Sequence, residues 1–289
     1  MRVDFHVHST ASDGTCSPTE IAAMASRGGY AAIALTDHDN GDGIAEFMSA
    51  DPQLRKIAGV ELSIEPGRGF DKFHLLALGV NPENAGLKAF LRSILDGRNE
   101  RNGRIFSNFH RLGIDIKPEP HGEVLARPHF ANWLCSHGYA ASIKEAFEKY
   151  LLPDSPRETR CYEERYHPSQ EEAFAVVHAA GGLCVMAHPK FWRRNWKVSG
   201  PEYVDAEREL AAVKERGLDG LEAHYQANTP DEDHAFEMIA TRLGLLKTAG
   251  SDFHGAHKPT ISLGMEVSDA FIGPFLDRVC VAGVGGDLV

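Results

Sequence analysis

The chain has 289 residues and is 43% hydrophobic, which is enough apolar content for one large α/β domain or for a domain with an insertion. Its formal net charge of −11 excludes a global attraction to nucleic acid, so we expect no duplex DNA partner. No apolar run reaches the roughly 20 residues that span a bilayer, and Met1-Arg2 leads straight into polar sequence, so we expect a cytoplasmic protein without a membrane partner.

Seven short apolar stretches recur along the chain, and most of them end in polar residues. This pattern is typical of strands in a parallel α/β sheet, whose ends carry the functional side chains. The stretches cover residues 3–9, 31–39, 57–64, 73–80, 182–189, 218–225 and 245–254. Ser17-Pro18 and Pro168-Ser169 predict the starts of helices over 21–27 and 173–180, so strands and helices alternate.

This alternation stops between residues 87 and 164. Helical patterns cover 87–112, 128–137 and 142–152 in that region instead. We therefore expect the first part of a barrel over 1–86 and its second part over 165–289. The segment 87–164 is predicted to be a helical insertion that caps the substrate.

Histidines and carboxylates gather at the predicted strand ends. His6 and His8 are two apart on the first strand, so both imidazoles point to one face and can reach one metal or a close pair of metals. A single histidine is more often a hydrogen-bonded core residue, but the whole set indicates a metal site. Nitrogen and oxygen ligands without thiolates suit zinc, manganese or iron, and the sequence does not choose among these. Every strand except the sixth supplies a candidate, and the others are Asp13, His38, Glu61, His74, His188, Asp252 and His254.

In their order along the chain, the motifs H-x-H, S-D-G, T-D-H-D, G-V-E, A-H-P and S-D-F-H-G resemble those of the PHP (polymerase and histidinol phosphatase) family of phosphoesterases. The resemblance covers nearly the whole chain. It implies a distorted (β/α)7 barrel, similar to a TIM barrel, and two to three divalent metal ions (Mn, Zn or Fe). The implied ligands are His6, His8, Glu61 and Asp252 for one metal, Glu61, His74 and His188 for a second, and Asp13, His38 and His254 for a third.

The chemistry that this resemblance implies is the hydrolysis of phosphate esters. Metal ions hold phosphate oxygens as Lewis acids and lower the pKa of a water, so that a metal-activated hydroxide attacks phosphorus. Asp252, as a proton-transfer group, and Glu61, as the bridging ligand, are the catalytic candidates. Neither a P-loop nor a G-x-G-x-x-G follows a predicted strand, so we expect no organic cofactor.

Within the family, the chain most resembles the bacterial branch that removes phosphate from nucleoside 3′,5′-bisphosphates and trims short RNA from its 5′ end. The resemblance lies in residues 126–131, Ala-Arg-Pro-His-Phe-Ala, and in residues 255–259, Gly-Ala-His-Lys-Pro. It implies a small phosphorylated nucleotide as the substrate, with short RNA as a further candidate.

Several basic residues are candidates for binding this substrate. The guanidinium of Arg127 matches a pair of phosphate oxygens, although a helix-capping arginine at the surface has the same sequence signature. Arg98 and Arg101 share one face of a predicted helix, which is either a phosphate clamp or a solvated surface. The remaining candidates are His129, Lys190 and His224.

Three other functions are compatible with parts of this pattern. A cyclic phosphate diesterase of the same family would use the same ligands. The Arg127-Pro128-His129 segment disfavours a histidinol phosphate phosphatase. The nine acidic or histidine positions argue against a non-catalytic PHP module that has lost its ligands. The sequence does not indicate an oligomeric state.

Overall fold

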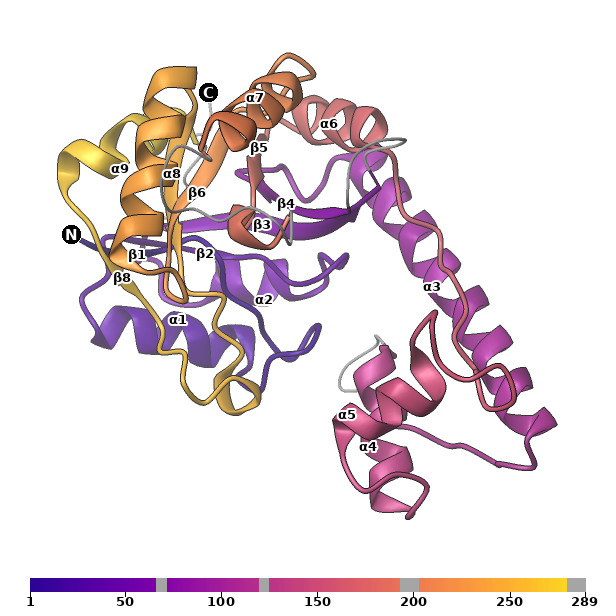
Figure 1. Ribbon diagram of the computed structural model, residues 1–289. Helices are drawn as coiled ribbons and strands as arrows, with labels where there is room; N and C mark the ends of the chain where they lie inside the picture. Colours follow the sequence, from indigo (N-terminus) through magenta and orange to yellow (C-terminus); the bar gives the residue numbers. More distant parts are fainter. Residues whose placement is uncertain (66–71, 120–124, 193–202, 280–289) are drawn as a thin grey trace. The chain divides into compact units, whose positions relative to one another are not determined.

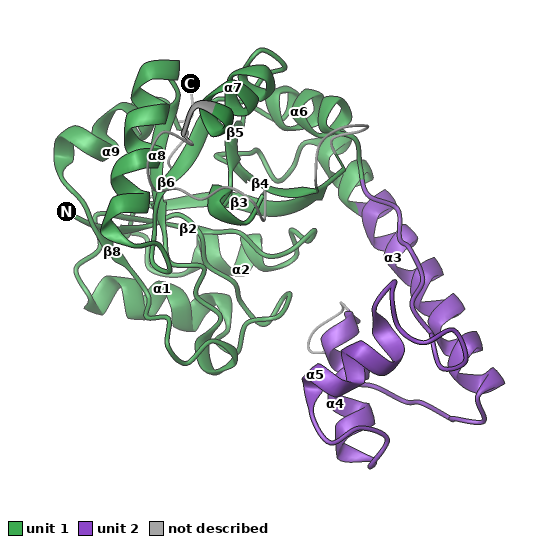
Figure 2. Ribbon diagram, in the orientation of Figure 1, with its two compact units in different colours: residues 1–91, 168–289 green, residues 92–167 purple. Residues whose placement is uncertain are grey.

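The computed structural model describes residues 1–65, 72–119, 125–192 and 203–279 (Figure 1). The chain divides into two compact units (Figure 2). The first, which we call the barrel unit, consists of residues 1–91 and 168–289, and the second, the insert unit, consists of residues 92–167. The barrel unit is therefore assembled from two segments that are far apart in the sequence.

The barrel unit is built on an eight-stranded sheet with the order β7-β6-β5-β4-β3-β2-β1-β8. Each of the seven predicted strands is confirmed by an observed strand that overlaps it. The strand β8 was not predicted, because two residues are too few to give a pattern. The strands are β1 (Arg2–Asp4), β2 (Ala32–Leu35), β3 (Lys56–Ile64), β4 (Phe73–Leu78), β5 (Leu183–Met186), β6 (Gly220–Tyr225), β7 (Leu246–Gly250) and β8 (Met265–Glu266).

The prediction of a parallel sheet is wrong for strand β4. This strand runs antiparallel to both of its neighbours, β3 and β5. The segment between β3 and β4 is too short to contain the crossover of a dozen or more residues that a parallel neighbour requires. The other neighbouring pairs from β1 to β7 are parallel, as predicted.

The ring of strands closes between the residues that follow β1 and those that follow β7. Val7 forms a parallel bridge with Phe253, and the amide of His8 donates a hydrogen bond to the carbonyl of Phe253 at 2.9 Å. The amide of Phe5 donates to the carbonyl of Ala249 at 3.0 Å. Closure places the first and last ligand-bearing segments of the chain side by side.

Six helices lie around the barrel in the described part of the chain (Figure 1). Their starts follow ordinary capping chemistry: the side chains of Ser17, Ser169 and Thr229 each accept a hydrogen bond from the amide three residues later. The strands β2 and β3 are buried along their whole length. The helices are α1 (Pro18–Arg27), α2 (Gly43–Ser49), α6 (Gln170–Ala179), α7 (Tyr203–Lys214), α8 (Pro230–Leu243) and α9 (Asp269–Leu276).

The insert unit is helical and has its own hydrophobic core. It contains α3 (Ala85–Arg111) from residue 92 onward, α4 (Arg127–Ser136), α5 (Ile143–Ala146) and a π-helical turn, Phe147–Leu151. Phe109, Phe130 and Tyr150 pack together in this core, with the Phe109 and Tyr150 ring centres 5.6 Å apart. No helix among the described residues is both long enough and apolar enough to cross a membrane.

Candidate metal centre

All nine predicted metal ligands lie within the barrel strands or in the loops that immediately follow them. Contacts between imidazole nitrogens and carboxylate oxygens connect the nine side chains into one cluster. His6, His8 and Asp13 follow β1, His38 follows β2, Glu61 lies in β3, His74 lies in β4, His188 follows β5, and Asp252 and His254 follow β7.

Glu61 is the centre of this cluster. Its side chain is fully buried, and both of its carboxylate oxygens face imidazoles. The nitrogen-to-oxygen distances are 2.8 Å for His74, 3.1 Å for His188 and 3.3 Å for His6 at Oε1, and 2.8 Å for His38 and 3.2 Å for His8 at Oε2. A single carboxylate therefore joins imidazoles that come from four different strand ends.

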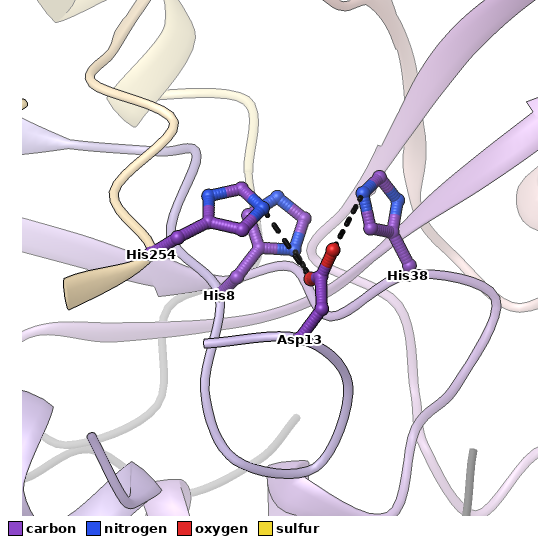
Figure 3. Close-up of side chains that lie close together, drawn as sticks. All are labelled: His8, Asp13, His38 and His254. Carbon is purple, nitrogen blue, oxygen red and sulfur yellow. Dashed lines mark ion pairs between the residues drawn. The ribbon is translucent and has the colours of Figure 1, made fainter. Parts of the chain in front are cut away.

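Asp13 is the centre of a second group, formed with His8, His38 and His254 (Figure 3). Its Oδ1 lies 3.3 Å from Nε2 of His254 and 3.7 Å from Nδ1 of His8, and its Oδ2 lies 3.8 Å from Nε2 of His38. Asp37 holds the loop that carries Asp13, because its carboxylate accepts hydrogen bonds from the hydroxyls of Ser9 and Ser12, each at 2.6 Å.

The hydrogen bonds of two histidines show that their second nitrogens suit a cation. Nδ1 of His254 lies 2.8 Å from the backbone carbonyl of Asp252, which can only accept, so this nitrogen carries the proton. Nδ1 of His6 is likewise engaged by Oε1 of Glu222 at 2.9 Å. In the neutral imidazoles, Nε2 then presents a lone pair to the carboxylates of Asp13 and Glu61. A cation between these atoms would satisfy both.

Four buried polar atoms of the cluster have close neighbours but no partner in hydrogen-bonding geometry. They are Nε2 of His6, both ring nitrogens of His8 and Oε2 of Glu61. Buried nitrogen and oxygen atoms are normally paired, because leaving them unpaired costs free energy. Several unpaired atoms in one place, all of types that bind zinc, manganese or iron, fit a metal centre.

Three groups of side chains within this cluster could hold an ion, because their ligand atoms lie within 4.8 Å of one another. They differ in detail from the implied ligand sets: His8 also lies in the Asp13 group, and His38 joins Glu61 and His74. The groups are His8, Asp13, His38 and His254; His6, His8 and Glu61; and His38, Glu61 and His74.

The electrostatics of the cluster favour ionised carboxylates. Burial raises the pKa of Glu61, but the nearby His38, His6 and His74 outweigh this effect and hold its pKa well below the usual range. Burial lowers the pKa of His8, but the nearby carboxylates of Asp252 and Glu61 outweigh this effect and raise it to about 9. Without metal, the cluster therefore keeps protons that a bound cation would displace.

Three residues beside the metal-binding groups have backbone conformations that are unusual for residues other than glycine. Asp39, His188 and Asp252 have φ values of 51°, 26° and 60°. Such conformations cost about 1–3 kcal/mol each and persist where surrounding contacts hold them in place. Here Asp39 accepts a 2.9 Å hydrogen bond from the amide of Ser63, and the amide of Asp252 donates to the carbonyl of His6 at 2.9 Å. Strained backbone thus aims two of the predicted ligands, His188 and Asp252.

The sixth strand supplies a residue that the sequence reasoning missed. Glu222 is fully buried on β6, and its carboxylate accepts from Nδ1 of His6 and from the amide of His188. It orients the side chain of one predicted ligand, His6, and the backbone of another, His188. The available signal was an acidic residue inside an apolar strand, since a charged group in such a place requires a specific partner.

A cavity of about 560 Å³ opens onto the cluster. On one wall, Lys258 places its ammonium 2.6 Å from Oδ2 of Asp252, and the hydroxyl of Tyr225 donates to the same oxygen at 3.1 Å. Oδ1 of Asp252 faces His6 and His8, at 3.6 and 3.4 Å. The two oxygens of this carboxylate therefore have different partners, imidazoles on one side and the cavity-lining Lys258 and Tyr225 on the other.

Two predicted substrate contacts in the barrel unit lie outside the lining of this cavity. His224 contacts helices α8 and α9 instead, with Nε2 3.3 Å from Glu237 and its ring 4.2 Å from that of Phe271. Lys190 binds Glu232 at 2.7 Å. Residues two apart on a regular strand point to the same face, but a β-bulge between Glu222 and His224 breaks this alternation, so the two side chains have different surroundings.

The other predicted substrate contacts belong to the insert unit. Arg98 and Arg101 are 7% and 3% exposed, so the alternative of a solvated helix face is wrong for both. Arg127 is half-buried at the first turn of α4. The ring of His129 accepts a hydrogen bond from the amide of Ala126 at 2.8 Å, which caps this helix.

Residues 4–179 match the model of the PHP domain family. The chain is 32% identical over 260 residues to the 3′,5′-nucleoside bisphosphate phosphatase of Chromobacterium violaceum, covering 87% of each chain. It is 31% identical over 261 residues to the 5′-3′ exoribonuclease of Haemophilus influenzae, covering 88% of this chain and 90% of the relative. A phosphoribosyl 1,2-cyclic phosphate 1,2-diphosphodiesterase of Eggerthella lenta is 27% identical over 278 residues, covering 92% and 99%.

Solved structures share this fold over almost the full length. An amidohydrolase from Chromobacterium violaceum, with bound sulfate and no metal, superposes with a TM-score of 0.77 at 30% identity and covers 96% of this chain and 95% of its own. A protein from Bifidobacterium adolescentis, assigned as a metal-dependent phosphoesterase, gives a TM-score of 0.74 at 28% identity and 96% coverage of both chains.

Proposed function

The chain belongs to the PHP domain family, and we propose that it is a metal-dependent phosphoesterase that hydrolyses phosphate monoesters of nucleotides, with nucleoside 3′,5′-bisphosphates as its preferred substrates. The observation that carries this proposal is the cluster around Glu61, in which buried imidazole nitrogens and a carboxylate oxygen lack hydrogen-bond partners beside an open cavity. This arrangement suits a phosphate bound between divalent ions.

Two to three divalent ions fit the ligand groups of the cluster. His6, His8, Glu61 and Asp252 would hold one, and Glu61 with His74 and His188 a second. Asp13, His38 and His254 would hold a third. When bound, such ions polarise phosphate oxygens and lower the pKa of a water. The ligand types fit manganese, zinc and iron equally well.

The other residues of the site act on these ligands. Glu222 fixes the His6 ring with Nε2 toward Glu61, so one nitrogen is available for a metal. Tyr225 and Lys258 hold Oδ2 of Asp252, which keeps Oδ1 directed at the imidazoles. The Lys258 ammonium also lines the cavity, where it adds positive charge close to an incoming phosphate.

Two observations support the choice of substrate. The relative with 32% identity is a 3′,5′-nucleoside bisphosphate phosphatase, and the match covers 87% of both chains. The cavity of about 560 Å³ lies within the usual range for sites of small ligands, about 300–1,000 Å³. The exoribonuclease relative makes the 5′ end of short RNA a further substrate to test.

A cyclic phosphate diester is the second candidate substrate. The Eggerthella lenta relative acts on such an ester and is matched over 99% of its length. A cyclic ester would need the same metal ligands, because both reactions break a P–O bond of a phosphate ester.

Chromatographic analysis of the products from adenosine 3′,5′-bisphosphate, adenosine 3′-monophosphate and a ribose 1,2-cyclic phosphate separates the two candidate substrates, because the monoesters release phosphate whereas opening of the cyclic diester gives a phosphomonoester. The protein should be loaded with manganese and with zinc in parallel. We expect the bisphosphate to give the highest kcat/KM. Turnover of the cyclic ester alone would retain the metal centre and contradict the proposed substrate, and turnover of none of the three would contradict the proposed function.

A further inference from the structure

A second group of side chains that can bind a metal lies in the barrel unit, at the starts of two strands. His178 on α6, Cys184 on β5 and Asp219 just before β6 each offer one ligand atom, and these three atoms lie within 4.8 Å of one another. The candidate catalytic ligand His188 instead follows the end of β5. The two groups of ligands therefore lie at opposite ends of this strand.

The turn after α6 brings His178 to the start of β5. The helix ends at Ala179, and the amide of Gly181 donates to the carbonyl of His178 at 2.9 Å. Gly181 has a φ of 79°, a conformation that favours glycine and reverses the chain at the end of a helix. Because α6 packs against β5, this short return places the last turn of the helix beside Cys184.

Backbone hydrogen bonds fix Cys184 and Asp219 side by side. The amide of Asp219 donates to the carbonyl of Cys184 at 2.9 Å, and the amide of Cys184 donates to Oδ2 of Asp219 at 2.8 Å. The carbonyl of Asp219 accepts from the amide of Leu246 at 2.9 Å, which ties the same residue to β7. Two of the three ligands are thus held by the sheet before any ion binds, which lowers the entropic cost of binding.

His178 reaches the same carboxylate from the solvent side. Its Nε2 lies 2.7 Å from Oδ2 of Asp219, and its side chain is 41% exposed, whereas Cys184 is fully buried. A Cβ at Gly217, whose φ is 119°, would lie 3.3 Å from Cε1 of the His178 ring. Glycine at this position therefore leaves space beside the imidazole, so a water molecule can reach an ion held by the three side chains.

The thiol distinguishes this group from an ordinary surface ion pair. An exposed pair of His178 and Asp219 contributes little stability by itself and makes no use of the sulfur beside it. Burial and the nearby Asp219 raise the pKa of the Cys184 thiol well above its usual range, so this thiol keeps its proton and is not a reactive nucleophile. A soft divalent ion would displace the proton and bind the sulfur.

We propose that His178, Cys184 and Asp219 bind a zinc ion, with water as the fourth ligand, at a site separate from the catalytic centre. Zinc accepts sulfur, nitrogen and oxygen ligands together in tetrahedral geometry. The thiolate selects zinc over manganese and magnesium, which prefer oxygen ligands. A bound ion would join α6 to the starts of β5 and β6. The proposal does not depend on which ester the protein hydrolyses.

Cobalt(II) is the probe for this site, because a bond between cobalt and thiolate absorbs in the near ultraviolet. The nine candidate ligands of the catalytic centre contain no sulfur, so cobalt bound there does not give this band. Chelator-treated full-length protein is titrated with cobalt, and we expect a band that saturates at one thiolate-bound ion per chain and disappears when zinc is added. Cys184→Ser should abolish the band. The matched control Cys161→Ser, a buried cysteine of the insert unit, should retain it.

His178→Ala, at an exposed position, provides a second variant if Cys184→Ser fails to fold. It should weaken the cobalt affinity measured from this band by at least about 10–100-fold, since even residues that only orient a ligand contribute that much. His110→Ala, which removes an exposed histidine from α3, is its control. Absence of the band in the wild type, its persistence in Cys184→Ser, or unchanged affinity in His178→Ala would overturn the proposal. Because the readout is thiolate absorption, a failed phosphoesterase assay would leave it unaffected.

Discussion

Nδ1 of His6 lies 2.9 Å from Oε1 of Glu222, and both side chains are fully buried. The other oxygen of Glu222 accepts from the amide of His188. One carboxylate on β6 therefore orients two candidate metal ligands from two other strand ends. Residues of this kind fix the tautomer and direction of a ligand, and their loss typically costs about 10–100-fold in metal affinity or activity.

We therefore predict that Glu222→Gln lowers metal affinity by about 10–100-fold, because the amide nitrogen of glutamine cannot accept from both His6 and His188. Competition with a fluorescent chelator measures this affinity directly. Glu237→Gln is the control. Glu237 lies on helix α8 outside the lining of the cavity, where it pairs with His224. Equal affinities in Glu222→Gln and the wild type would show that the hydrogen bond to His6 does not position a ligand.

Lys258→Met should reduce kcat/KM by about tenfold or more with little change in metal content. The ammonium lies at the cavity wall, 2.6 Å from Oδ2 of Asp252, so its loss removes positive charge near the phosphate and one restraint on Asp252. Lys190→Met removes the same charge from a lysine that pairs with Glu232 instead. If both variants lose activity equally, net charge and not the position of Lys258 is responsible.

The metal-free protein should lose stability as the pH rises from about 6.5 to 9. Burial lowers the pKa of His8, but the nearby carboxylates of Asp252 and Glu61 outweigh this effect and raise it to about 9, above the value of about 6.5 in the unfolded chain. The folded state therefore keeps a proton that contributes stability fully below pH 6.5, and this contribution disappears as the pH passes 9. Urea unfolding of chelator-treated protein at pH 6.5 and 9.5 measures the difference.

We expect a loss on the order of 1 kcal/mol or more in the free energy of unfolding. The metal-loaded protein should lose less over the same range, because a bound cation replaces the proton. A metal-free protein that is more stable at pH 9.5 than at 6.5 would contradict the assignment of protons to this cluster.

Gly250→Ala should abolish high-affinity metal binding. A Cβ at this position, the last residue of β7, would overlap Oε1 of Glu222 and Cβ of His6. Neither atom can move without breaking the hydrogen bond between these two residues, so the His6 ring would lose its direction. Gly273→Ala, whose Cβ would meet no atom within 4 Å, is the control. Metal content after dialysis checks the prediction, and a fully loaded Gly250→Ala protein would refute it.

Seven barrel strands could be predicted from the sequence, because each is an apolar stretch followed by polar residues. The ligand-rich motifs could be predicted for the same reason, since they lie at strand ends. The antiparallel direction of β4 follows from a connection too short for a crossover, which the pattern of apolar stretches does not encode. The strand β8 has two residues, and its pairing with β1 depends on tertiary contacts.

Residues that orient the candidate ligands are harder to recognise in the sequence than the candidate ligands themselves. Glu222 is recognisable only once the fold brings it beside His6, which is more than 200 positions away in the sequence. Lys258 is only six positions from Asp252, but their contact is seen only in the fold. The position of His224 at the end of a strand predicts a substrate contact, but the β-bulge after Glu222 places this side chain against α8 and α9. For Arg101, helical spacing could not distinguish a buried cluster from a solvated face.

The most direct test of the central claim, that the cluster around Glu61 is a catalytic metal centre, measures bound metal and phosphate release in the same samples. Chelator-treated protein receives increasing manganese, and phosphate release from adenosine 3′,5′-bisphosphate is followed. We predict that activity rises in proportion to bound metal, and that His188→Ala and Asp13→Ala lose both while His224→Ala keeps both. Phosphate release that continues in metal-free protein, or that survives in His188→Ala without bound metal, would contradict the claim.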